Sequence, residues 1–341
     1  MSLLRRRLHP EGLISATARG DMADCLRPLS GQARVVWRFT DGRPGHDTQS
    51  LGLIEAVGRY LPVDVHTLSV PEKAATWPDM LTGRYAAGVR LPDPWLLVGA
   101  GRRTHLSLLA ASRARRGRTV VIMRPAFPLA LYDLCIIPDH DDPASAPNVL
   151  VTRGSLNRAQ RATGQQGTQG MILVGGPSRH HHWRDEAVAA QIARIIRCSP
   201  PREWVLATSR RTPSGFAEQV RRQVDRADTT LTLMPWQGER SGPRVESQLG
   251  RSLCAWVTED SVSMVYEALT AGVATGLLEV PAHGNGRVVE GIRRLAASGQ
   301  VTGFGDWVAG KPLQPPGDSF DEANRSARWI CEQWGASSSR Y

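Results

Sequence analysis

A histidine in a glycine-rich turn is the first residue whose type and setting point to chemistry. In "RFTDGRPGHDTQS", residues 38–50, an apolar run is followed within a few positions by His46. Imidazole is the side chain best matched to proton transfer near neutral pH, so we expect His46 to act as a general base. Gly42 and Gly45 would let the backbone approach a bound molecule closely. The simpler interpretation is that His46 only helps to cap the helix expected at 48–60.

A second loop, "GGPSRHHHW" at residues 175–183, has the composition of a phosphate-binding turn. Paired glycines at a strand end free backbone N–H groups, and the helix expected from about residue 184 adds its N-terminal dipole. The three adjacent histidines cannot readily converge on one ion, and no acidic residue has a ligand spacing, so no metal site is predicted. The predicted phosphate contacts are Gly175, Gly176, Ser178 and Arg179.

A third loop, "ATSRRTPSG" at residues 207–215, combines arginines with a predicted helix start at Pro213. Guanidinium groups beside a helix N-terminus bind anions through fork geometry and the helix dipole together. The alternative is ordinary solvated charge, which is common in an arginine-rich chain. The predicted phosphate contacts here are Ser209, Arg210 and Arg211.

The fourth loop, "VTEDSVSMVYEALTAG" at residues 257–272, joins a strand to a helix. Either Asp260 or Ser261 can cap that helix, which leaves the first N–H groups for an anion. Glu267 lies about two turns further on, where a carboxylate can accept hydrogen bonds from the vicinal hydroxyls of a ribose. The alternative is a capped surface helix with an exposed glutamate. The predicted phosphate contacts are Ser261, Val262, Ser263 and Met264.

Strands and helices alternate along the chain so that each of these loops follows a strand. Short apolar runs separated by stretches of helical period predict an α/β fold with mostly parallel sheets. The predicted strands cover residues 34–40, 63–68, 95–100, 119–124, 134–138, 171–176, 203–208, 230–235, 254–258 and 274–280. The predicted helices cover residues 48–60, 103–116, 184–197, 213–226, 261–271 and 319–334.

A polar stretch rich in Gly and Gln divides these elements into two halves. The 341 residues suffice for two domains of about 150 residues each. Two open sheets in tandem would face a central cleft, and ligands bind at the carboxyl ends of such strands. We predict an extension at 1–31, an N-terminal domain at 32–156, a linker at 157–170 and a C-terminal domain at 171–317. The C-terminal helix expected within 318–341 could pack on either domain, and in two-domain folds of this kind such a helix often crosses back to the N-terminal domain.

The composition indicates a protein that attracts anions. Arginine carries nearly all of the net charge of +10, because Lys73 and Lys311 are the only lysines. No zinc-finger spacing, aromatic RNA-binding motif or long basic run is present, so nucleic acid is not an expected partner. A phosphorylated small molecule and an anionic membrane surface both fit the charge.

Compartment and membrane association are predicted from the same composition. No apolar run is long enough to span a bilayer, and residues 1–31 lack the apolar segment of a signal peptide. An amphipathic membrane tether is an alternative for residues 1–31. The five scattered cysteines predict reduced thiols, and therefore a cytoplasmic protein with at most peripheral contact at the inner face of the membrane.

The four loops, read together, resemble a known family. The segments "DGRPGHDTQS", "VGGPSRHHHW", "TSRRTP" and "VTEDSVSMVYEAL", in this order, are similar to those of the ELM1-like family, which is related to the mitochondrial fission factor of plants. The likeness covers most of the chain after residue 32. That family is in turn similar to GT-B glycosyltransferases, such as the peptidoglycan enzyme that adds N-acetylglucosamine to a lipid carrier. The resemblance implies a GT-B-like fold of two Rossmann-like domains, with the acceptor bound in the first and the sugar donor in the second.

The resemblance also implies roles for particular residues. In the peptidoglycan enzyme a turn ending in Gly-His lies in the acceptor half, as Gly45 and His46 would here, and a ribose-binding glutamate in the other half matches Glu267. Two departures are "GERSGPRVESQLG" at 238–250, where the family usually has a Gly-Glu-Asn-Pro-Tyr-like stretch, and "GVA" at 272–274 in place of Gly-Lys-Pro. The implied acceptor-side loop consists of Asp41, Gly42, Gly45 and Gln49 around His46.

The implied function is transfer of a sugar from a nucleoside-diphosphate sugar to an unidentified acceptor, which a lipid carrier would hold at the membrane. Inversion is expected, and no cofactor or metal is expected because arginines and helix N-termini can stabilise the leaving diphosphate. Two alternatives stay open. One is a non-catalytic adaptor on a membrane surface, as the plant relatives imply, and the other is a nucleotide-sugar epimerase on a similar two-domain fold.

Overall fold

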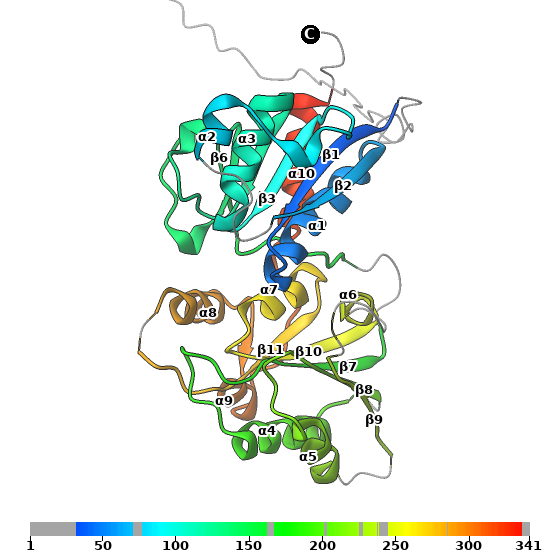
Figure 1. The fold of residues 1–341 in the computed structure, drawn as a ribbon. Helices are drawn as coiled ribbons and strands as arrows, with labels where there is room; N and C mark the ends of the chain where they lie inside the picture. Colours follow the sequence, from blue (N-terminus) through cyan, green and yellow to red (C-terminus); the bar gives the residue numbers. More distant parts are fainter. Residues whose placement is uncertain are drawn as a thin grey trace, which may run out of the picture.

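Two parallel sheets form the centre of the protein, one in each half of the chain (Figure 1). The structure is a computed structural model that describes residues 32–70, 77–161, 167–200, 203–224, 228–236, 238, 245–284 and 286–335. Within these residues each sheet has six strands, and every pairing between them is parallel. The predicted α/β fold with two Rossmann-like, mostly parallel sheets is confirmed. The predicted extension at 1–31 lies outside the described residues.

The N-terminal sheet has the strand order β2-β1-β3-β4-β5-β6. Strands that follow one another through helical crossovers must be buried on both faces, which accounts for apolar runs such as "LLVGA" and "LCIIP". The strands are β1 Arg34–Thr40, β2 Val63–Ser69, β3 Leu96–Ala100, β4 Arg118–Ile122, β5 Leu134–Pro138 and β6 Val149–Thr152.

The C-terminal sheet has the strand order β12-β11-β10-β7-β8-β9. Its central strands β7 and β10 are almost wholly buried, since helices cover both faces of the sheet. The strands are β7 Gln169–Val174, β8 Glu203–Thr208, β9 Thr230–Met234, β10 Ser252–Thr258, β11 Ala274–Leu278 and β12 Thr302–Gly303.

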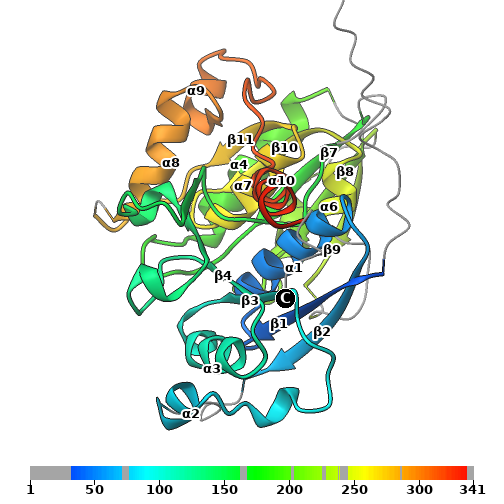
Figure 2. The same cartoon turned by 90° about the horizontal axis from the view of Figure 1, so that it is seen from above.

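Helices pack on both faces of each sheet (Figure 2). Among the described residues, their apolar side chains and those of the strands form four buried clusters. In the N-terminal half, α1 and α10 cover one face of the sheet, while α2 and α3 cover the other. Helix α10, which follows the C-terminal half in the sequence, packs beside α1 of the N-terminal half, as a helix that crosses back would. These helices are α1 Pro44–Gly58, α2 Trp77–Thr82, α3 His105–Arg115 and α10 Glu322–Trp334.

In the C-terminal half, α4, α5 and α9 cover one face, and α6, α7 and α8 cover the other. Figure 1 shows α7 at the top of this half, directly below the beginning of α1. None of the helices in the described segments is long and apolar enough to cross a bilayer. The helices are α4 Asp185–Cys198, α5 Phe216–Gln223, α6 Val245–Leu249, α7 Val262–Thr270, α8 Arg287–Ala297 and α9 Phe304–Val308.

Each sheet has one point where the strand order changes direction. In the N-terminal sheet this point lies between β1 and β3, and in the C-terminal sheet it lies between β7 and β10. Crossovers leave in opposite directions there, so a crevice opens beyond the carboxyl ends of the two strands. His46 follows β1, and the loops at 175–183 and 257–272 follow β7 and β10. The topology therefore places the predicted chemistry at both crevices.

The structure differs from the sequence predictions mainly at element ends. Helix α1 begins at Pro44 rather than near residue 48, because proline suits the first helical position. Helix α5 begins at Phe216, after Pro213 and the left-handed Gly215. Strand β7 begins at Gln169, inside the predicted linker, whose residues 162–166 lie outside the described part of the chain. The strands β6 and β12 and the helices α2, α6, α8 and α9 were not predicted, because their apolar patterns are short or interrupted.

Candidate functional site

His46 lies in the first turn of α1, where Asp41 fixes its ring. The imidazole Nδ1 is 3.0 Å and 3.1 Å from the two carboxylate oxygens of Asp41, whose side chain is 1% exposed. An ionised carboxylate only accepts hydrogen bonds. Nδ1 of His46 therefore carries the proton and donates a hydrogen bond to Asp41. The lone pair is then on Nε2, and this is the protonation pattern that a histidine base requires.

Gly101, directly after β3, makes room for this ring. A Cβ atom on Gly101 would lie 2.3 Å from Nδ1 and Cε1 of His46, and the glycine has φ +85°. Both the close approach and the left-handed backbone exclude any other residue without a rearrangement. The ring of His46 thus lies between β1 and β3 at the switch point of the N-terminal sheet.

Buried polar contacts hold the beginning of α1 in place. Arg38 donates to Asp47 at 2.9 Å, and Thr40 also bonds that carboxylate. Gly42, in the predicted acceptor-side loop, donates its N–H to the Thr40 hydroxyl at 3.0 Å. In the next turn of α1, Gln49 is buried and its Oε1 has no hydrogen-bond partner among the described residues.

A second histidine, His105, lies close to this site in the interior of the N-terminal half. His105 is buried at the start of α3, and its Nδ1 accepts a hydrogen bond from the N–H of Ala126 at 3.3 Å. Burial is the main cause that lowers the pKa of His105 to about 4, and the nearby Arg102 and His46 lower it further. With this pKa the buried His105 is a weak proton acceptor, and its Nδ1 is already bonded to Ala126, so His46 is the better candidate for the base.

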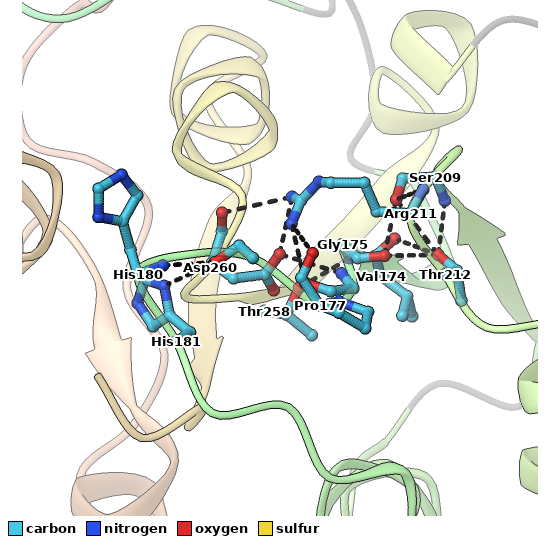
Figure 3. Close-up of polar contacts among 12 residues, drawn as sticks. Val174, Gly175, Pro177, His180, His181, Ser209, Arg211, Thr212, Thr258 and Asp260 are labelled. Carbon is cyan, nitrogen blue, oxygen red and sulfur yellow. Dashed lines mark hydrogen bonds and ion pairs between the residues drawn. The ribbon is translucent and has the colours of Figure 1, made fainter. Parts of the chain in front are cut away.

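Three of the predicted loops meet at the switch point of the C-terminal sheet (Figure 3). Asp260 accepts a hydrogen bond from the N–H of Gly176 at 3.0 Å and forms an ion pair with Arg211 at 2.7 Å. Arg211 also donates to the carbonyl of Gly176 at 2.8 Å, while Ser209 donates to the carbonyl of Gly175 at 2.6 Å. The loops after β7, β8 and β10 thereby form one network.

This network corrects the role expected for the paired glycines. The N–H of Gly175 donates to Thr258 at 2.8 Å, and that of Gly176 donates to Asp260, so neither is a free donor for phosphate. A Cβ on Gly175 would lie 2.2 Å from the Asp260 carboxylate. At Gly175 the absence of a side chain therefore allows close packing against Asp260. Helix α4, whose N-terminus was expected to add to the phosphate site, begins only at Asp185.

Arg211 also differs from the expectation, because its charge is already paired. Asp260 is completely buried and bonds the guanidinium, which ties the loops together and offsets its attraction for an anion. Ser261 occupies the N-cap position of α7, but no side chain caps the helix, so the cap expected from Asp260 or Ser261 does not form. Arg210 and Arg179 are exposed beside this network. The Oγ atom of Ser178 lies 3.4 Å from Nδ1 of His181.

The N-terminus of α7 keeps its free donors. The first turn contains Val262, Ser263 and Met264, whose N–H groups have no acceptor within a helix and receive no side-chain cap here. The dipole of a nine-residue helix adds partial positive charge at this point. This turn therefore keeps the anion-binding capacity that the sequence predicts.

Glu267, further along α7, is a carboxylate without a partner among the described residues. Burial, with a smaller contribution from the nearby negative charge of Glu246, raises its pKa to about 8. Such a group is mostly protonated at pH 7 and is stabilised in its charged form by any hydroxyl that donates to it. No contact among the described residues joins Glu267 to His46. That the two residues act in one site therefore stays a prediction.

A cavity of about 300 Å³ opens between the loop after β11 and α8. Its walls include His181, Glu259, Glu279 and Arg293. Burial lowers the pKa of His181 and raises that of Glu259. Within the described ranges, no three His, Cys, Asp or Glu side chains are arranged to hold a metal ion.

Sequence reasoning missed several residues that build these sites. Gly101 and Thr258 end apolar strands, and their roles depend on contacts with distant loops. The sequence suggested only a capping role for Asp260, although the acidic pair of Glu259 and Asp260 directly after a buried strand is a signal for a site at the sheet edge. His181 was seen only as part of a histidine run, but its neighbours do not share its burial.

Comparisons with known proteins agree with this architecture. The profile of the family described as mitochondrial fission ELM1 matches residues 44–334. Among solved structures, UDP-GlcNAc 2-epimerase from Methanocaldococcus jannaschii aligns over 88% of this chain and 100% of its own, with 10% identity and a TM-score of 0.51. MurG from Acinetobacter baumannii aligns over 89% of this chain and 93% of its own, with 13% identity and a TM-score of 0.45.

At 10% identity the likeness to the epimerase shows a shared fold and no more. This chain has a GT-B-like fold of two Rossmann-like sheets. Among curated protein sequences, none matches this chain.

Proposed function

Since this chain belongs to the mitochondrial fission ELM1 family and has a GT-B-like fold, we propose that it is a glycosyltransferase that uses a nucleoside-diphosphate sugar. The N-terminal half would bind the acceptor and the C-terminal half the donor. The observation that carries this proposal is the pair of Asp41 and His46. A pure scaffold has no need of a buried carboxylate that fixes the tautomer of a histidine at a sheet's switch point.

The proposed reaction begins when Nε2 of His46 removes the proton of an acceptor hydroxyl. The acceptor oxygen then forms a bond to the anomeric carbon, and the bond from that carbon to the phosphate oxygen breaks. The nucleoside diphosphate leaves with the bonding electron pair, and attack from the opposite side inverts the anomeric centre. Asp41 stabilises the imidazolium that forms, as the carboxylate of a catalytic triad does.

The donor half supplies binding groups for each part of the sugar nucleotide. The free N–H groups at the start of α7 would bind the diphosphate, and Glu267 would accept hydrogen bonds from the ribose. The cavity beside Glu259 and Glu279 would hold the sugar, whose hydroxyls suit carboxylate acceptors. The helix dipole and Arg210 would stabilise the leaving group, so the proposal requires no metal. The unpaired amide oxygen of Gln49 would contact the acceptor.

The first experiment is a thermal-shift screen of the full chain against nucleoside-diphosphate sugars. A ligand at 100 times its Kd stabilises the folded state by about 2.7 kcal/mol, which such a screen detects. Turnover of the sugar that binds is then compared in His46→Ala and Asp41→Asn. The matched control is Asp64→Asn, which alters another aspartate–histidine pair, between Asp64 and His66 on β2 at 3.3 Å.

Loss of the base should lower turnover by about 10²- to 10⁴-fold while donor affinity stays nearly unchanged. Asp41→Asn should lower turnover and alter its pH profile, whereas Asp64→Asn should do neither. Wild-type turnover in His46→Ala would refute the proposed base. Absence of binding by every nucleotide sugar would favour a membrane-surface adaptor, and a donor whose sugar is inverted at a ring carbon without transfer would identify an epimerase.

A further inference from the structure

A second cavity, separate from the candidate site, lies between the two halves of the protein. Its volume is about 290 Å³, at the lower end of the range for small-molecule sites. The N-terminal half contributes Asp139 and Arg153, which follow β5 and β6, and the C-terminal half contributes Arg294 on α8 and Tyr266 on α7. None of the residues proposed above for catalysis or donor binding lines it.

One polar atom in the wall of this cavity is buried and lacks a partner. The Oε1 atom of Gln300 has no hydrogen-bond partner among the described residues. Tyr266, which is 5% exposed, contributes a second polar side chain to the same wall. A buried polar group without a hydrogen bond is costly, and native proteins generally satisfy such groups with water or a ligand. The Oε1 atom of Gln300 therefore favours an occupant that donates a hydrogen bond, such as a hydroxyl group.

The charges around the cavity balance. Asp139 and Asp318 face Arg153 and Arg294, and Arg153 is paired with Asp318 at 2.9 Å. Such a wall offers both donors and acceptors, so it suits a ligand whose groups both donate and accept. A strongly anionic or cationic ligand would meet one pair of like charges, which opposes its binding.

Apolar surface completes the wall. The rings of Tyr266 and Phe320 lie 6.3 Å apart, and both residues line the cavity with Leu295. Aromatic edges and aliphatic groups beside polar side chains accommodate the C–H faces of a sugar ring as well as its hydroxyls.

We infer that this cavity binds an uncharged carbohydrate of one or two rings at a site distinct from the donor site. The walls of this cavity come from both halves of the protein. An occupant would therefore contact both halves at once and stabilise their position relative to each other. The inference does not depend on the proposed transfer reaction, since binding is measured without turnover.

The experiment measures binding of neutral sugars to the full chain by saturation-transfer NMR and calorimetry. The probes are N-acetylglucosamine, its β-1,4-linked disaccharide and methyl glucoside, with glucuronate and glucosamine as charged sugars of similar size. UDP-N-acetylglucosamine is present in a parallel series, so that binding in a donor site is recognised by competition.

The principal variant is Gly291→Trp on α8. Gly291 lines the cavity, and a Cβ there would have no heavy atom within 4 Å, so the helix can accept the side chain while the indole fills the space. Gly303→Trp is the matched control, because Gly303 is equally unobstructed but does not line the cavity. Should Gly291→Trp fail to fold, Tyr266→Phe tests the same wall, with Tyr60→Phe as its control.

We expect at least one neutral sugar to bind, with an affinity at least about tenfold lower in Gly291→Trp and about 2- to 12-fold lower in Tyr266→Phe. The two control variants and His46→Ala should bind it as the wild type does. Binding of no neutral sugar, preferential binding of a charged sugar, or unchanged binding in Gly291→Trp and Tyr266→Phe would each overturn the inference.

Discussion

Replacement of Glu267 by glutamine tests the donor site through the ionisation of one buried carboxylate. Burial, and to a lesser extent Glu246, raises the pKa of Glu267 from its ordinary value of 4.5 to about 8. At pH 7 only about one molecule in ten then has the charged form. If the ribose hydroxyls bind the carboxylate, donor affinity should rise about tenfold between pH 7 and pH 9, as the charged form becomes dominant.

The same pKa predicts a pH dependence of stability. Because the pKa is raised in the folded state, the folded protein binds this proton more tightly than the unfolded chain between pH 4.5 and about 8. The contribution of Glu267 to stability is therefore fully present below pH 4.5 and is lost as the pH rises through 8. At about 1.4 kcal/mol per pKa unit the upper limit is about 5 kcal/mol. Solvent reaches the partly accessible side chain, so we expect Glu267→Gln to stabilise the protein by about 1 to 3 kcal/mol at pH 8.

The assay combines calorimetric titration of the donor with urea unfolding between pH 4 and pH 9. The Glu267→Gln variant should bind donor more weakly at pH 9, by about 10- to 150-fold, and its affinity should not change across this pH range. Glu246→Gln is the companion variant, because loss of the neighbouring charge should move the wild-type transition to lower pH. A flat affinity profile in the wild type, together with unchanged affinity in Glu267→Gln, would refute the role given to this carboxylate.

Two further predictions concern the switch points of the sheets, and a third concerns the absence of a metal requirement. Gly101→Ala should destabilise the protein by about 1 to 3 kcal/mol and displace His46, because the new methyl group would overlap the imidazole ring. Thermal unfolding measures the loss of stability and turnover measures the displacement, so full turnover in this variant would contradict the geometry. Asp260→Ala should lower the free energy of unfolding by about 2 to 3 kcal/mol, because Arg211 and the N–H of Gly176 lose their acceptor. Urea unfolding measures this change, and a decrease below about 0.5 kcal/mol would show that the network does not stabilise the fold. Treatment with EDTA should leave turnover unchanged, and a loss restored by added Mg²⁺ or Mn²⁺ would contradict the metal-independent proposal.

The sequence predicted most strands of this fold because their physical cause is local. A strand buried between two layers of helices must be continuously apolar, as "RVVWRFT" and "EWVLAT" are, and β1, β5 and β8 begin and end at the predicted residues. Turn residues marked the loops at their ends. The four segments carrying the candidate residues were therefore found without knowledge of how the chain folds.

Contacts between distant loops could not be read in the same way. The pairing of His46 with Asp41 is local, but its fit against Gly101 depends on β1 and β3 being neighbours in the sheet. Likewise Asp260 and Gly176 are 84 positions apart, and only the order β10-β7 brings them together. Strand order is set by which crossovers pack, and the sequence pattern of a single strand carries no record of it.

The types of chemical groups were thus determined by the sequence, while their availability was decided by the tertiary structure. Gly175 and Gly176 had the residue type of a phosphate loop, yet Thr258 and Asp260 occupy their N–H groups. Glu267 had the type of an ordinary surface glutamate, yet burial raises its pKa to about 8. The physical reason is that a donor, an acceptor or a charge is free only if nothing nearby satisfies it, and which groups are nearby is a property of the folded chain.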